Sequence, residues 1–362
     1  MLFRSNYGMR HVGQFYHREQ IISYGFEISY EKYHFDTWDN YFVNKILLTH
    51  QIQDRNNTNF FVQYDNYFYE KSNISLGLGI NNISYNWVCC DKREINELNY
   101  KFKGIISPRL SYNYQLKKNS LFINISHGFS SPSIDETLDE NGFVNPNIKP
   151  ETGWNYEIGL IGSSLKNKIS YNLNLYFMNI KNLLVAQRTS YDTFVGINAG
   201  ETTHPGIEIK LNYIVYKKNF SSLIISNNFS KYWYRFKKFN HQDNDYSSNK
   251  LTGVPSQTLY SKIDFSYKKI ISQLSLYSVG KIPINDSNDL FSNPYSIFNF
   301  KVSKTFNLNS IDIYLTTGIN NLFNKKYASG IVINAVGFGN SEPRYFYPGL
   351  PRNFFITLTL EI

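Results

Sequence analysis

A small set of side chains in this sequence is suited to contact a polar ligand. Arginine can hold a carboxylate or phosphate through two parallel hydrogen bonds, and tyrosine combines a stacking face with a hydroxyl group. All but His204 lie in predicted connections between strands, and His204 lies at a predicted bend. The candidates for ligand contact are Arg188, Tyr191, His204, His241, Arg344, Tyr345 and Tyr347.

Sequence motifs for catalysis are absent. The sequence contains no HExxH, CxxC, GxSxG, P-loop or complete GxGxxG motif, and Gly77 and Gly79 supply only two glycines inside a predicted strand. The 7 histidines are dispersed, and the acidic residues are not paired on a helix for acid–base chemistry. We therefore expect no enzymatic activity, no cofactor and no metal centre.

The composition favours strands and excludes several classes of protein. Tyrosine and phenylalanine number 30 and 28, and aromatic residues reach 17%, which is too many for a disordered chain. The net charge of +9 is scattered, without the basic cluster expected of a nucleic-acid-binding protein. Only 2 cysteines occur, and no apolar run is long enough for a membrane-spanning helix.

The elements that would position the candidate residues are strands. Apolar and polar residues alternate with period two over segments of roughly ten residues, which predicts strands with one apolar and one polar face. The last segment shows this most clearly, because Phe354, Ile356, Leu358 and Leu360 alternate mostly with polar residues. No segment of comparable length has helical periodicity.

The periodicity predicts about 16 strands. Gly200 and Gly206 inside one long segment predict a bend or bulge there. Ser133 and Glu136 have the spacing of a capping box, which predicts one helical turn in a loop. The strands are expected near 9–20, 22–36, 41–54, 58–69, 74–88, 98–116, 119–128, 153–165, 168–186, 192–216, 220–236, 256–267, 270–280, 294–305, 310–322 and 352–362.

The connections between these strands alternate between short and long. Short polar turns are expected near 70–73, 116–119, 165–168, 216–219, 267–269 and 306–309. Longer loops are expected near 89–97, 129–152, 187–191, 237–255, 281–293 and 324–351. This alternation is typical of an up-and-down barrel in an outer membrane, where short turns face the periplasm and long loops face the exterior. The apolar face then contacts lipid, and the polar face lines the lumen.

Five segments resemble the C-terminal part of TonB-dependent outer-membrane receptors. They occur in order along the chain, and together they are more specific than any one alone. The segments are ISHGFSSPS with DETL (125–138), NPNIKPE with NYEIG (145–159), NAGETTHPGIE (198–208), NLFNKKY (321–327) and PGLPRN (348–353).

The resemblance implies an all-β, antiparallel, up-and-down transmembrane barrel that binds a scarce ligand at its outer face. In that family a barrel of 22 strands encloses a plug, and the TonB complex supplies energy through a box ahead of the plug. We expect residues 1–362 to be the C-terminal part of such a barrel without a plug domain, with about 16 of the 22 strands. The expected partners are outer-membrane lipid, the TonB complex through a missing plug, and an iron complex or another small-molecule ligand.

Two departures from the family leave other functions open. The first residues lack the apolar segment of a secretory signal, and the chain is short for a complete barrel. We therefore expect a truncated gene product. One alternative is a passive, porin-like channel, and the other is a secreted, soluble β-rich binding protein.

Overall fold

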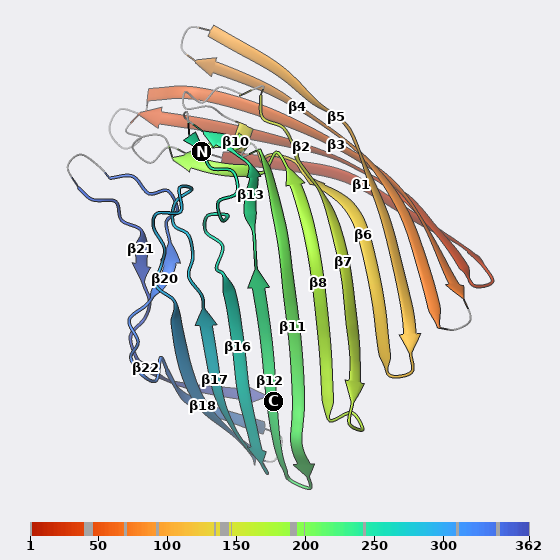
Figure 1. The fold of residues 1–362 in the computed structure, drawn as a ribbon. Coiled ribbons are helices and arrows are strands. Elements are labelled where there is room, and N and C mark those ends of the chain that lie inside the picture. Colours follow the sequence, from red (N-terminus) through yellow and green to blue (C-terminus); the bar gives the residue numbers. More distant parts are fainter. Residues whose placement is uncertain are drawn as a thin grey trace. The chain divides into compact units, whose positions relative to one another are not determined.

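The computed structural model describes residues 2–39, 46–68, 71–91, 94–133, 135–137, 145, 147–188, 194–198, 200–241, 244–308, 311–337 and 341–361. The chain divides into two compact units. The first is composed of Met1–Tyr114, Asn124–Tyr156 and Ile180–Ala199, and the second of Gln115–Ile123, Glu157–Asn179 and Gly200–Ile362. Long antiparallel strands dominate both units (Figure 1).

In the first unit, consecutive strands pair with one another. The strands β1 (Leu2–His17), β2 (Gln20–Asp39), β3 (Ile46–Phe68), β4 (Ser72–Asp91) and β5 (Glu94–Leu116) form an antiparallel series in chain order. Strands β9 (Leu184–Arg188) and β10 (Phe194–Asn198) pair as a small hairpin, and the 3-10 turn η1 spans Asp135–Thr137.

The second unit has the same up-and-down order. Its long strands are β11 (Glu201–Lys218), β12 (Ser221–Tyr232), β16 (Gln257–Tyr267), β17 (Ile270–Val279), β18 (Tyr295–Leu308), β19 (Ile311–Asn320) and β22 (Asn353–Glu361). Short strands lie in the connections: β13 (Arg235–Lys238), β14 (Asn240–His241), β15 (Asn244–Asp245), β20 (Ala328–Ile331) and β21 (Phe346–Pro348). The boundaries of the units divide β6 (Asn119–Ser130), β7 (Glu151–Ser164) and β8 (Ile169–Lys181), and they also separate the last two residues of β5 from the rest of that strand.

The predicted short turns are confirmed, and several are two residues long. Strands β11 and β12 pair up to Lys218 and Ser221, and β16 and β17 pair up to Tyr267 and Ile270. The first turn residue has a positive φ in each, 47° at Asn219 and 51° at Lys268. Such a φ gives the turn a twist that matches the twist of the flanking strands.

Most predicted long connections are confirmed as well. They join β6 to β7, β8 to β11, β12 to β16, β17 to β18, and β19 to β22. The expected loop at 89–97 is wrong, because β4 and β5 continue to pair until Asp91 lies opposite Glu94. The long loops therefore gather at the ends of the strands opposite the short turns.

Several predicted strand boundaries are also wrong. The expected strands 41–54 and 58–69 are one continuous strand, β3, in which Asn57 pairs with Ser29 on β2 and with Ile83 on β4. Pairing on both sides overrides the turn preference of the asparagines in this segment. Strand β1 begins at Leu2, its turn is at residues 18–19, and β8 ends at Lys181 before the separate strand β9. The predicted bend is present at Gly200, where φ is +69°.

Each strand series has one exposed apolar face, as predicted. In the first unit, Tyr24, Val62 and Leu78 lie opposite one another on neighbouring strands and are 49%, 46% and 43% exposed. In the second unit, Leu358 lies opposite Leu315 and is 61% exposed. A water-soluble β-protein would bury these side chains, whereas a barrel in lipid exposes them. We call this surface the apolar face, and the opposite one the polar face.

Candidate functional site

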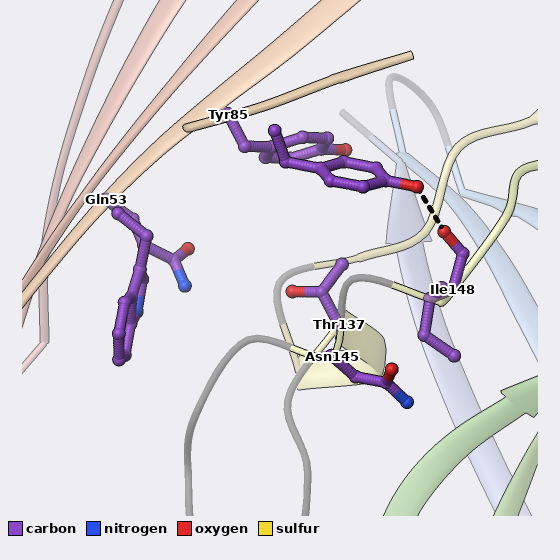
Figure 2. Close-up of a pocket in the computed structure, with 7 residues that line it drawn as sticks. Gln53, Tyr85, Thr137, Asn145 and Ile148 are labelled. Atoms are coloured by element: carbon purple, nitrogen blue, oxygen red, sulfur yellow. Dashed lines mark hydrogen bonds between the residues drawn. The ribbon is translucent and has the colours of Figure 1, made fainter. Parts of the chain in front are cut away.

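An aromatic pocket lies on the polar face of the first unit, near the strand ends that carry the long connections. Gln53 on β3 lies opposite Trp87 on β4, and Tyr85 lies opposite Tyr100 on β5. The connection between β6 and β7 covers these side chains, as Figure 2 shows. The complete lining is Gln53, Tyr85, Trp87, Tyr100, Thr137, Asn145 and Ile148.

Two strand tyrosines hold the covering connection by its main chain. The Tyr85 hydroxyl donates to the carbonyl of Pro132 at 2.9 Å. The Tyr100 hydroxyl donates to the carbonyl of Ile148 at 2.8 Å, the bond drawn as a dashed line in Figure 2. Phe102 packs edge-on against Tyr85 and Tyr100, with ring centroids 5.6 and 4.7 Å away. The connection is thus fixed at two separate points on a rigid aromatic base.

The predicted capping box closes the start of this connection. The Ser133 amide donates to Glu136 Oε2 at 2.6 Å, and the Glu136 amide donates to Ser133 Oγ at 3.4 Å. These reciprocal bonds satisfy two main-chain donors of the one-turn helix η1. The sequence spacing therefore located the turn that carries Thr137 to the pocket.

Two buried polar atoms face the pocket without a described hydrogen-bond partner. They are Gln53 Oε1 and Trp87 Nε1, and their residues are only 7% and 1% exposed. The space enclosed between the lining side chains is about 20 Å³, which is enough for one water molecule. At this volume the pocket is too small for a larger ligand.

A charged cluster lies beside the pocket on the same face. The Glu31 carboxylate lies 3.1 Å from Arg4 and 4.0 Å from Arg55, and it accepts a 2.7 Å hydrogen bond from Tyr33. Arg55 also donates to Ser131 Oγ at 2.7 Å. These bonds tie the charges to one another and to the covering connection, so the wall of the polar face is preorganised here.

In the second unit, His204 is buried and contacts Thr202 and Tyr234. Its Nε2 lies 2.9 Å from Thr202 Oγ1, and its ring stacks on Tyr234 with centroids 4.3 Å apart. The hydroxyl groups of Tyr234 and Tyr176 are 2.7 Å apart. Burial raises the pKa of Tyr234, which lies in the connection after β12, so its phenol stays neutral. The His204 ring is thus held between Thr202 and Tyr234.

The other predicted contact residues lie at the ends of the strands that carry the long connections. Arg188 ends β9, and His241 ends β14. Arg344 is exposed just before β21, Tyr345 is partly buried, and Tyr347 in β21 is 63% exposed. Tyr191 lies outside the residues that the structure describes. Among the candidate residues that the structure describes, Arg344, Tyr345 and Tyr347 lie close together, at and just before β21 in the hairpin of β20 and β21.

None of the residues that line the aromatic pocket was predicted from the sequence to contact a ligand. Tyr85 and Trp87 alternate along β4 on the polar face, and that alternation of large aromatic residues was a usable signal. Gln53 gave no such signal, because its segment was predicted to end at residue 54 and its partner strand was not known. In the described part of the chain, no three His, Cys, Asp or Glu residues are grouped to hold a metal ion, and no helix is long and apolar enough to cross a membrane.

Comparison with solved structures shows which fold this strand arrangement represents. The structure is similar to the copper transporter OprC (TM-score 0.77, 15% identity), to the ferric citrate transporter FecA (0.75, 14%) and to the siderophore receptor PiuA from Acinetobacter baumannii (0.72, 14%). Each comparison covers 99% of this chain, but only 58%, 54% and 56% of the respective structure. The chain thus spans a little over half the length of these proteins, with which it shares a fold.

The chain also matches a protein family over most of its length. The family described as "TonB dependent receptor-like, beta-barrel" matches residues 3–322. That range includes three of the five segments on which the resemblance rested and the first two residues of a fourth, and it begins in the first strand. The exposed apolar face and the alternation of short and long connections agree with it. This chain belongs to the TonB-dependent receptor-like β-barrel family, and its location is the bacterial outer membrane.

Proposed function

We propose that this chain forms part of the barrel wall of a receptor that takes up a scarce iron complex of the siderophore type. The observation that carries the proposal is the family match over residues 3–322. The fold is shared with a siderophore receptor and a ferric citrate transporter, which favours iron, and with a copper transporter, which makes copper the main competitor. In this proposal the TonB complex supplies the energy, through plug and TonB-box segments.

The ligand in this proposal is held by the long connections and the nearby polar face. Of the candidate residues whose side chains the structure describes, Arg344 and Tyr347 are the most accessible, and they lie three positions apart around β21. A guanidinium and a phenol at this spacing suit a ligand with carboxylate or catecholate oxygens. The remaining candidates, Arg188, Tyr191, His204, His241 and Tyr345, stay predictions for the same role.

Binding and transport should be measured separately. The chain is expressed together with the plug and TonB-box segments that the proposal requires, in a strain without its own receptors. The cells are given radioiron complexed with citrate, a catecholate or a hydroxamate, with copper and haem for comparison. Binding is measured in the cold, and uptake is measured at growth temperature with and without an uncoupler. We expect one iron complex to bind saturably, and its uptake to stop when the uncoupler is added.

The opposite results identify the alternatives. Uptake of all solutes regardless of the uncoupler, together with conductance in planar bilayers, would show a passive channel. Recovery of the chain in the soluble fraction without detergent would exclude any barrel. The double variant R344A/Y347A should weaken binding of the iron complex at least tenfold, and the variant Y24F, on the apolar face, should bind normally.

A further inference from the structure

A hollow of about 300 Å³ lies at one end of the second unit. Its lining includes four basic residues and no acidic one, so we call it the basic hollow. Three chain segments form its walls: the end of β12 with the start of β13, the connection before β16, and the residues after β17. Its lining is Lys231, Tyr232, Trp233, Tyr234, Arg235, Lys250, Leu251, Val254, Pro255, Ser256, Lys281 and Pro283.

Main-chain hydrogen bonds join the three segments. The Tyr232 amide donates to the Ser256 carbonyl at 3.1 Å, and the Ser256 amide donates to the Lys281 carbonyl at 2.9 Å. The Leu251 amide donates to the Tyr234 carbonyl at 3.0 Å. The hollow is therefore preformed and does not depend on side chains closing around a ligand.

The four cations of the hollow are not neutralised by any carboxylate that the structure describes. Lys231 donates to the Gln257 amide oxygen at 3.4 Å, and Arg235 donates to the Ser248 carbonyl at 2.7 Å. The Lys250 ammonium lies 5.4 Å from the centre of the Phe291 ring. Four positive charges around one concave surface, with neutral partners only, create a strong attraction for an anion.

The register of the strands shows on which face Lys231 and Arg235 lie. Lys231 pairs with Ile207, and Arg235 pairs with Thr203, so both lie on the face of β11 that carries Ile207 and Leu211. That is the apolar face. Trp233, between them, is 44% exposed. An aromatic residue beside cations, above an apolar band, is typical of the membrane interface.

The position of the hollow along the strands indicates which leaflet of the membrane it contacts. Strands β11 and β12 are joined by the two-residue turn at residues 219–220, and the hollow is at their opposite end, where the long connections begin. In barrels of the outer membrane, short turns face the periplasm and long loops face the exterior. The hollow therefore lies at the level of the outer-leaflet headgroups.

We propose that the basic hollow binds a phosphate group of an outer-leaflet lipid headgroup, as found on lipid A. The phosphate interacts with Lys231, Arg235, Lys250 and Lys281. The apolar wall of Leu251, Val254, Pro255 and Pro283 contacts the part of the lipid next to the phosphate. A soluble anion would use the cations alone, and a transported ligand would use the polar face. The proposal rests on the membrane location of the barrel and not on the identity of its transported ligand.

The test uses the full chain, purified from outer membranes in a mild detergent and titrated with diphosphoryl lipid A. Native mass spectrometry counts bound lipid. The variant K250Q/K281Q removes two charges from the hollow, and the control K217Q/K218Q removes two charges at the opposite end of β11. Both variants must first show the same folded mobility in gel electrophoresis as the wild-type chain.

We expect K250Q/K281Q to weaken lipid A binding at least tenfold, and K217Q/K218Q to change it less than twofold. Dephosphorylated lipid A should bind the wild-type chain at least tenfold more weakly. Equal affinity of K250Q/K281Q and the wild-type chain would overturn the proposal. Binding of inorganic phosphate as tight as that of lipid A would also overturn it, because the site would then be one for free anions.

Discussion

The phenol of Tyr100 on β5 donates a 2.8 Å hydrogen bond to the main-chain carbonyl of Ile148, which lies 48 positions further along the chain. Tyr85 makes the corresponding bond to Pro132 at 2.9 Å. The two bonds begin on adjacent strands of the polar face and end near opposite ends of one long connection. They turn what would be a free loop into a cover over the aromatic pocket.

The double variant Y85F/Y100F tests this attachment. It removes both hydroxyl groups and keeps the rings, so each lost bond should reduce the free energy of unfolding by about 0.5–1.5 kcal/mol. Hydrogen exchange and protease cleavage should increase in residues 131–150 before they increase elsewhere. The variant Y24F, which removes an exposed hydroxyl on the apolar face, is the control. Unchanged exchange in Y85F/Y100F would show that the bonds do not hold the cover.

Gly206 allows Tyr176 to reach Tyr234. A Cβ at Gly206 would lie 2.3 Å from the Tyr176 hydroxyl and ring, so G206A must displace the ring and break the bond between the two phenols. We expect it to lower the free energy of unfolding by about 1–3 kcal/mol, as overpacking does. The control is G77A, whose new methyl group would meet its nearest atom at 3.6 Å. Urea unfolding in detergent measures both, and equal midpoints would contradict the close packing.

A substitution on the apolar face tests whether this face contacts lipid or water. Leu78 is 43% exposed on that face, so L78R would be almost neutral if the face contacted water. In a barrel, an arginine near the middle of the bilayer lowers stability by about 2–4 kcal/mol. The matched variant is Q63R, because Gln63 pairs with Gly77 on the polar face. Refolding into lipid vesicles should fail or weaken for L78R and proceed for Q63R; equal refolding would argue against lipid contact.

The turn between β1 and β2 contains a residue in an unfavourable conformation. Arg18 has a φ of 51°, in the left-handed region that costs a side-chain-bearing residue roughly 1–2 kcal/mol. Glycine has no such cost, although it loses more entropy on folding. We expect R18G to raise the free energy of unfolding by up to about 1 kcal/mol, and the neighbouring change E19G to lower it. If R18G lowers it too, the turn is not strained.

Particular residues show how far the sequence by itself determined this protein. The alternation that ends in Leu358 and Leu360 fixed the strands and the apolar face, because side-chain direction in a strand follows only from position. Local chemistry also located the bend at Gly200 and the capping box of Ser133 and Glu136. Family resemblance supplied the class of protein, which the match over residues 3–322 confirmed.

Only the tertiary structure decided which strands continue and which residues meet. Asn57 resembles a turn residue until its partners Ser29 and Ile83 are known. Trp87 and Ile148, or Arg235 and Lys281, come together through the register of strands and the path of long connections. Register arises from pairing across the whole sheet, and the path of a connection arises from contacts with distant strands. Neither is encoded in the residues next to them, so both sites appeared only in the folded chain.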